Sequence, residues 1–151
     1  MGDVLFYHLT DRPLDATLPV LLEKSLEAGW RVAVRGGDAA VLAWLDDQLW
    51  LRDGFLPHGR AGGPHDADQP VLLTEGAAAN APDCLMLVAG AEFSPDESAR
   101  LSRTCILFDD GDPRAVDQAR AYWRAATEAG LRAQYWADDG GRWVKKAESG
   151  T

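Results

Sequence analysis

The sequence has few of the residues on which most metal and redox sites depend. Its 151 residues include two cysteines and three histidines. Cys84 and Cys105 both lie inside apolar runs, which predicts two reduced, buried thiols, and two cysteines cannot build a disulfide framework. No apolar run approaches the roughly 18 residues of a transmembrane helix, and residues 1–10 lack the basic and apolar regions of a signal peptide. We therefore expect a cytoplasmic protein.

Basic residues are also scarce. The chain has 15 Lys and Arg against 24 Asp and Glu, for a net charge of −9. This balance argues against direct DNA binding, which depends on neutralising phosphates with Lys and Arg. The charge is uneven, however, because residues 1–110 hold 8 basic and 18 acidic residues, whereas residues 111–151 hold 7 and 6. We expect an anionic partner to dock on this last quarter.

Nucleotide-binding and hydrolase motifs are missing. The chain contains no G-x-x-x-x-G-K-[ST], no G-x-G-x-x-G after a predicted strand and no G-x-S-x-G. The best substitute, Arg35-Gly-Gly-Asp38, is too short to cradle a pyrophosphate, and Asp38 would repel one. We expect no cofactor.

The remaining candidate ligands for a metal are poorly arranged. His8 lies in a predicted strand, where a partly buried, hydrogen-bonded side chain is the simplest interpretation. Four other candidates fall in the Gly-rich stretch 52–69, predicted as a solvated loop whose spacing fixes no metal geometry: His58, His65, Asp66 and Asp68. Asp109 and Asp110 end a predicted strand, which leaves open a small metal-dependent nucleotide or phosphate hydrolase. Adjacent strand residues point to opposite faces, which disfavours one shared ion.

Apolar, strand-like runs alternate with helical patterns along the chain. The predicted strands are 4–9, 30–35, 71–74, 84–88, 105–108, 132–136 and 142–146. Predicted helices follow Thr17, Asp38, Ser94 and Asp112 as N-caps, and the second has an apolar stripe of Val41, Trp44, Leu45 and Leu49. This order predicts an α/β, Rossmann-like three-layer sandwich with a mainly parallel sheet. We expect one domain over residues 1–146, with 147–151 as a frayed tail.

The long helix predicted from Asp112 to about Ala129 carries two different faces. A stripe of small residues and one tyrosine is expected to pack on the sheet: Ala115, Ala119, Tyr122, Ala126 and Ala129. Arg120, Trp123 and Arg124 lie on another face. Trp123 is either the rim of the core or an apolar anchor beside two guanidiniums, which together would suit a partner with a carboxylate and an apolar side chain.

A second set of apolar residues surrounds the start of the long loop. Trp50 follows the second predicted helix, and Phe55 and Pro57 lie in the loop. These residues form either a local mini-core or an exposed protein-docking patch, and composition alone does not decide between them.

Several segments in order resemble the chi subunit family of bacterial DNA polymerase III. They read F-Y-H-L, L-E-A-G-W-R-V-A-V, A-W-L-D-D-Q-L-W, F-L-P-H-G and Q-P-V-L-L-T, followed by A-V-D-Q-A-R-A-Y-W-R-A-A-T-E-A-G. The likeness extends from about Val4 to Trp143. It implies a Rossmann-like fold without nucleotide chemistry and a non-catalytic accessory subunit of the clamp-loader assembly in DNA replication.

The resemblance also implies two partners. The acidic, Phe-terminated C-terminal tail of single-stranded DNA-binding protein would bind at Arg120, Trp123 and Arg124, where the family more often has Tyr in place of Trp123. A psi subunit would bind at Trp50 and Phe55 as a 1:1 heterodimer. In some members a repair helicase uses that second surface. DNA would then be contacted only through the partner.

Overall fold

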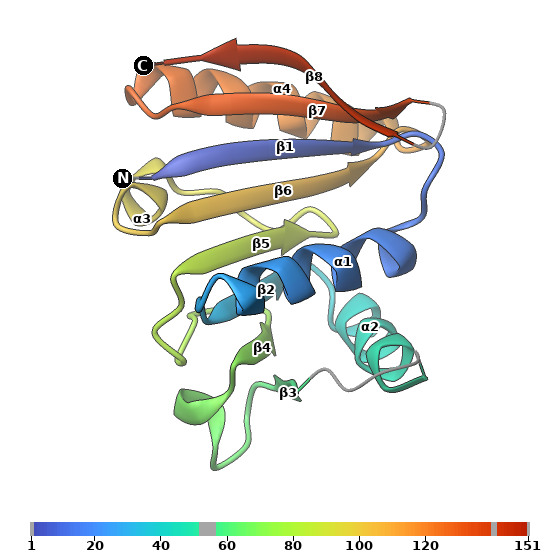
Figure 1. Cartoon of the computed structure of the whole chain (residues 1–151), viewed down its shortest axis with the longest axis vertical. Helices are drawn as coiled ribbons and strands as arrows, with labels where there is room; N and C mark the ends of the chain where they lie inside the picture. Colours follow the sequence, from blue (N-terminus) through green and yellow to red (C-terminus); the bar gives the residue numbers. More distant parts are fainter. Residues whose placement is uncertain (1, 52–56, 140–141, 151) are drawn as a thin grey trace.

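The computed structural model describes residues 2–51, 57–139 and 142–150 (Figure 1). The strands are β1 (Asp3–Leu9), β2 (Val32–Gly36), β3 (Gly59–Arg60), β4 (Val71–Thr74), β5 (Cys84–Val88), β6 (Arg103–Asp109), β7 (Ala133–Asp139) and β8 (Arg142–Ser149). The helices are α1 (Leu14–Glu27), α2 (Ala39–Leu51), α3 (Pro95–Ala99) and α4 (Pro113–Glu128), and Asp66–Asp68 form a 3-10 turn. None of the helices in these ranges is long and apolar enough to cross a membrane.

All eight strands form one sheet in the order β3-β4-β2-β5-β6-β1-β7-β8. Every pair is parallel except β7 and β8, which pair antiparallel. From β1 the chain crosses through α1 to β2, and from β6 it crosses through α4 to β7, so the two connections leave neighbouring strands in opposite directions. This confirms the predicted α/β sandwich with a mainly parallel sheet.

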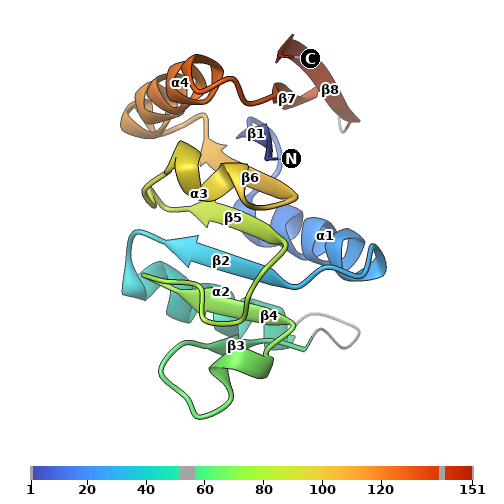
Figure 2. The same ribbon diagram turned by 90° about the vertical axis from the view of Figure 1, so that its left-hand side faces the viewer.

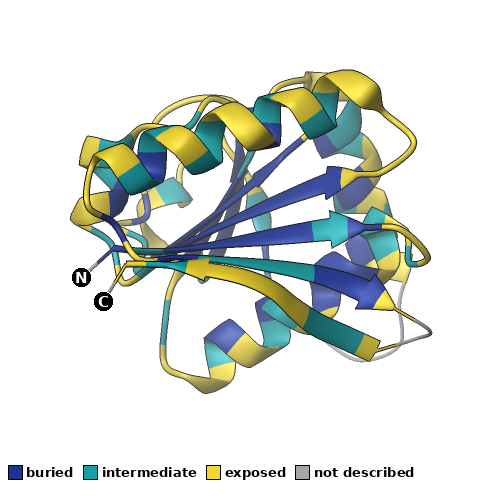
Figure 3. Ribbon diagram, turned by 90° about the horizontal axis from the view of Figure 1, so that it is seen from above, coloured by how far each residue is buried: buried dark blue, intermediate teal, exposed yellow. Residues whose placement is uncertain are grey.

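The core lies on both faces of the sheet, because successive strand residues point to opposite sides. On one face, Leu18 and Leu22 of α1 and Leu45 of α2 pack against alternate strand residues. On the other face, Ala119 and Ala126 of α4 pack against the intervening ones. Figure 2 shows α1 and α4 on opposite sides of the sheet. Figure 3 shows helices on both sides of strands that are largely buried, whereas the edge strand β8 is exposed along much of its length. The continuous apolar runs of β4 and β5 follow from this double coverage.

The helix starts agree with the predictions at three of four places. Ser94 accepts a hydrogen bond from the Glu97 backbone N–H, Asp112 accepts one from Arg114, and Asp38 accepts one from Ala40. The prediction of Thr17 as an N-cap is wrong, because α1 begins after Pro13 and the buried Thr17 hydroxyl donates to the Pro13 carbonyl inside the helix.

Three other predictions about local structure need correction. The tail expected to fray from Ala147 is paired instead, with Ala147 opposite Tyr135 and Ser149 opposite Ala133. The stretch 52–69 is not entirely loop, because Gly59–Arg60 pairs with β4. Trp44 does not belong to the buried stripe of α2, since Leu42, Leu45 and Leu49 face the sheet and leave Trp44 exposed.

A buried carboxylate joins the end of β7 to the segment between β1 and α1. Asp138 accepts hydrogen bonds from the backbone N–H groups of Thr10 (2.7 Å), Asp11 (3.0 Å) and Arg12 (2.6 Å), and also from the Thr10 hydroxyl. Burial raises the pKa of Asp138, but these hydrogen bonds outweigh burial and lower the pKa from 3.8 to about 2.

Candidate protein-binding surfaces

The α4 surface, defined as Arg120, Trp123 and Arg124, carries the residues predicted to bind an acidic tail. Arg120 has 73% of its side chain exposed, and among the described residues it forms one loose ion pair, with Asp117 at 3.8 Å. Arg124 is exposed one turn further along the helix. Ion pairs between such exposed groups contribute little to stability, so the two guanidiniums are available to an anionic partner.

Trp123 lies at the rim of the core and not free on the surface. Its ring is 5.4 Å from the Phe6 ring and 6.3 Å from the Tyr135 ring, measured between centroids. One edge of the indole is therefore fixed by the sheet, while the neighbouring arginines on the helix point into solvent. The two interpretations of Trp123 are compatible, because a rim residue held in place by packing can also present an apolar edge to a partner.

Two residues that the sequence analysis did not assign to this surface lie beside it. The Tyr135 hydroxyl is 2.6 Å from His8 Nδ1, and His8 Nε2 is 2.7 Å from Asp110 Oδ1. Burial raises the pKa of Tyr135, and the positive charge of Arg120 acts in the opposite direction. Arg120 and Tyr135 are thus close enough to interact electrostatically. His8 also stacks on Phe108 at 4.7 Å, which confirms the expectation of a partly buried, hydrogen-bonded histidine.

The α2 surface, defined as Trp44, Trp50 and Leu51, contains three of the four large hydrophobic side chains that are clearly exposed in the described residues. Their exposed fractions are 43%, 57% and 77%. Trp44 and Leu51 are seven residues apart and so share one face of the helix. Phe55, predicted to act with Trp50, lies outside the described residues.

A buried histidine, His58, packs against α2 beneath Trp50. The Trp50 and His58 rings are 4.3 Å apart, and His58 Nε2 lies 3.0 Å from Asp46 Oδ1. The prediction that His58 is solvated is wrong, because the strand β3 that follows brings it under α2. His65 is exposed, and Asp66 accepts hydrogen bonds from the backbone of Gly62 and Gly63, so these loop residues do not converge with His58.

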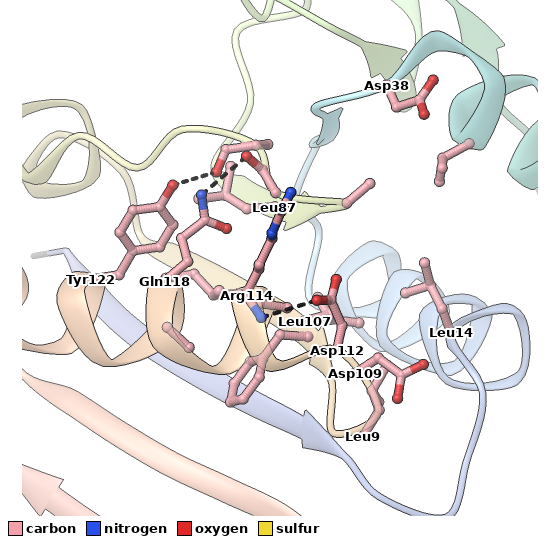
Figure 4. A pocket seen from close by; sticks show the side chains of 18 of the residues that line it. Leu9, Leu14, Asp38, Leu87, Leu107, Asp109, Asp112, Arg114, Gln118 and Tyr122 are labelled. Carbon is pink, nitrogen blue, oxygen red and sulfur yellow. Dashed lines mark hydrogen bonds between the residues drawn. The ribbon is translucent and has the colours of Figure 1, made fainter.

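A crevice of about 650 Å³ opens at the carboxyl ends of β1, β5 and β6, where open α/β sheets commonly bind ligands. Figure 4 shows Asp38 on the opposite side of this crevice from Asp109 and Asp112. Asp38 and Asp112 cap helices, and Asp109 accepts a hydrogen bond from the Gly111 N–H.

Asp109 and Asp110, the pair considered for a metal-dependent hydrolase, are engaged separately. Asp109 turns into the crevice, whereas Asp110 contacts His8. Within the described ranges, no group of three or more His, Cys, Asp or Glu side chains could hold a metal ion. The two cysteines are buried and free, and a hydrogen bond with Cys84, together with burial, raises the pKa of Cys105. They are reduced core thiols, as predicted.

The fold and these surfaces define an α/β protein whose two candidate surfaces carry aromatic or basic side chains suited to contacts with other proteins. The family model of the DNA polymerase III chi subunit, HolC, matches residues 1–134. The chain therefore belongs to the chi subunit family, whose members are non-catalytic accessory subunits of DNA polymerase III in DNA replication. No curated protein matches the chain. Most of β7 and all of β8 lie beyond the matched residues.

Proposed function

We propose that this protein links the DNA polymerase III clamp-loader assembly to single-stranded DNA-binding protein by binding that protein's acidic C-terminal tail on the α4 surface. The observation that carries this proposal is the exposed pair Arg120 and Arg124 beside the fixed indole of Trp123. Guanidinium groups bind carboxylates through charge-assisted, bidentate hydrogen bonds, and an indole edge offers an apolar contact to a terminal phenylalanine. DNA would then be reached only through the tail-bearing partner, in keeping with the acidic body of the chain.

The test is a titration with a fluorescent peptide carrying the tail of the cognate single-stranded DNA-binding protein, at low and high salt. We expect saturable, micromolar binding that weakens as salt is added. Arg120→Ala should weaken it by about tenfold, because a hydrogen bond to a charged group contributes about 1.5–3 kcal/mol. Arg114→Ala is the matched control, since Arg114 is exposed on the same helix but borders the crevice. Equal affinity of the wild type and Arg120→Ala for the tail peptide would show that the tail does not bind on the α4 surface.

The α2 surface is proposed to bind a second protein, a psi-type subunit, in a 1:1 heterodimer. Trp50 and Leu51 expose apolar area that a partner can bury, and aromatic anchors of this kind dominate many interfaces. Family likeness extends this proposal to Phe55 and to a repair helicase on the same surface. A cytoplasmic location is part of the same proposal.

Trp50→Ala separates the two surfaces. The variant should retain tail binding and lose co-purification with the psi-type subunit, because Trp50 lies on α2 and the tail residues lie on α4, against opposite faces of the sheet. Co-expression followed by size-exclusion chromatography measures the complex. Loss of both activities in a variant with an unchanged thermal midpoint would contradict the assignment of two separate surfaces.

A further inference from the structure

The sheet face that carries α1 is only partly covered. In Figure 1, α1 lies in front of β2, while no helix lies in front of β1, β7 and β8. A cavity of about 600 Å³ lies at this boundary, within the range that binds small ligands or inserted side chains. Its floor includes Tyr7 and Met86, one wall is α1 from Thr17 to Ala28, and the other wall is Trp136 and Trp143. We name this cavity the α1 groove.

The charged side chains that line the α1 groove are all basic, although the whole chain carries a net charge of −9. They are Arg12, Lys24 and Arg103, and no Asp or Glu is among the lining residues. The Arg103 guanidinium lies 5.1 Å from the Trp30 ring centroid. Within the described part of the chain, its Nε atom is buried without a hydrogen-bond partner. The groove therefore combines positive charge with a donor that lacks an acceptor.

Apart from Thr17 and Ser25, the rest of the lining is apolar or aromatic. Trp143 packs edge-on against Tyr7 at 5.2 Å, and Val20 on α1 is 45% exposed at the rim. The two hydroxyl groups on the α1 wall already donate hydrogen bonds within the helix, Thr17 to the Pro13 carbonyl and Ser25 to the Leu21 carbonyl. The groove thus offers apolar contact and positive charge, but few directed hydrogen bonds of the kind that distinguish one nucleobase from another.

We infer that the α1 groove binds an acidic peptide segment of a partner protein that inserts one large aromatic or aliphatic side chain. The inserted side chain would lie between Val20 and the indoles, and flanking carboxylates would reach Lys24 and Arg103. The wall from Thr17 to Ala28 is about 16 Å long, which matches about five extended residues. Lys145 lies on the same side of the sheet, because it pairs with Trp136 across the antiparallel ladder.

This site is separate from both proposed surfaces. The α4 surface lies on the opposite face of the sheet, and the α2 surface lies toward β3 and β4. Trp136 and Trp143 also lie beyond the residues that the family model matches. The inference therefore depends on the groove itself and not on tail binding.

The first experiment titrates the full chain with a fluorescent, acetylated and amidated peptide, Asp-Glu-Phe-Asp-Glu, while the indole N–H signals are followed by NMR. The amide end removes the terminal carboxylate proposed to bind on α4. We expect saturable binding that shifts indole signals of the groove and weakens with salt. Replacing the Phe of the peptide with Ala should weaken binding at least tenfold, because the apolar anchor is then lost. An absence of binding at millimolar peptide would overturn the inference.

Charge-reversal variants locate the site. Lys24→Glu should weaken binding about tenfold, and Val20→Glu should do the same, because Val20 lies one helical turn away on the same wall of the groove. Arg100→Glu is the matched control, because Arg100 is exposed at the end of α3 on the far side of the sheet. Equal losses in Lys24→Glu and Arg100→Glu would mean that only net charge matters and would overturn the inference.

Two further arms separate this inference from other binding. Arg120→Ala should leave the affinity for the amidated peptide unchanged. Loss of binding in that variant would mean that the peptide binds on α4, which would overturn the groove assignment but would not contradict tail binding. A thymidine oligonucleotide should not shift the indole signals. Tighter binding of that oligonucleotide than of the peptide would assign the groove to nucleic acid instead.

Discussion

The carboxylate of Asp138 is expected to stabilise the fold in a way that depends on pH. Asp138→Asn keeps the size of the side chain but replaces one carboxylate oxygen with a donor amide. That amide faces the backbone N–H groups of Thr10, Asp11 and Arg12, which now donate to the carboxylate. The variant therefore leaves at least one of these backbone donors without its acceptor.

The magnitude follows from the pKa of Asp138, which is about 2 in the folded protein against an ordinary value of 3.8. At about 1.36 kcal/mol for each pKa unit, this difference corresponds to about 2.4 kcal/mol. Thr10 and Asp11 are exposed, so solvent screens part of the interaction, and we expect about 1–2 kcal/mol. Because the folded pKa lies below the unfolded one, this stabilisation is complete above about pH 4 and is lost as the pH falls through 2.

Urea unfolding at several pH values measures this effect. The wild type should exceed Asp138→Asn by about 1–2 kcal/mol at pH 7, and the difference should fall by roughly half at pH 3. Asp139→Asn is the matched control, because Asp139 is exposed and its only described ion pair is with Lys146 at 3.5 Å. A difference between wild type and Asp138→Asn that stays constant from pH 7 to pH 3 would refute the assignment of the effect to this carboxylate.

Two other substitutions should lower stability for steric and polar reasons. Gly37→Ala should cost about 1–3 kcal/mol in thermal or urea unfolding, because its Cβ would lie 2.5 Å from the Ala89 carbonyl oxygen; an unchanged midpoint would contradict that close approach. Asn80→Ala should cost about 1–3 kcal/mol, because the buried Asn80 amide donates to the Val32 and Gln69 carbonyls. For Asn80→Ala, calorimetry showing wild-type stability would count against those two hydrogen bonds.

Much of the fold could be predicted because its signals are local. The apolar runs of β4 and β5 match their predicted bounds, and the Ser94 and Asp112 caps mark the starts of α3 and α4. The end of β8 could not be predicted in the same way, because residues 147–149 have no alternating apolar pattern and pair with β7 only through the backbone. The burial of His58 likewise depends on a two-residue strand at the far edge of the sheet.

In the candidate surfaces, too, local features could be predicted from the sequence and long-range contacts could not. Helical periodicity correctly placed Arg120, Trp123 and Arg124 together on α4. The contact between Tyr135 and His8 depends instead on β1 lying between β6 and β7, and strand order is not visible in one sequence. The prediction that Trp44 belongs to the buried stripe of α2 is wrong, because a helix with apolar residues on several sides gives no clear period.

The order of the strands has a consequence for an assembly in which both proposed partners bind. The α2 helix contacts β2, β3 and β4, whereas α4 contacts β6 and β7. Four strand spacings separate β4 from β1 at the centre of the α4 contacts, which is about 19 Å across the sheet. The sheet then acts as a stiff spacer that keeps the two partners from competing for space. A partner bound on the α2 surface is thereby held at high local concentration near a partner bound on the α4 surface.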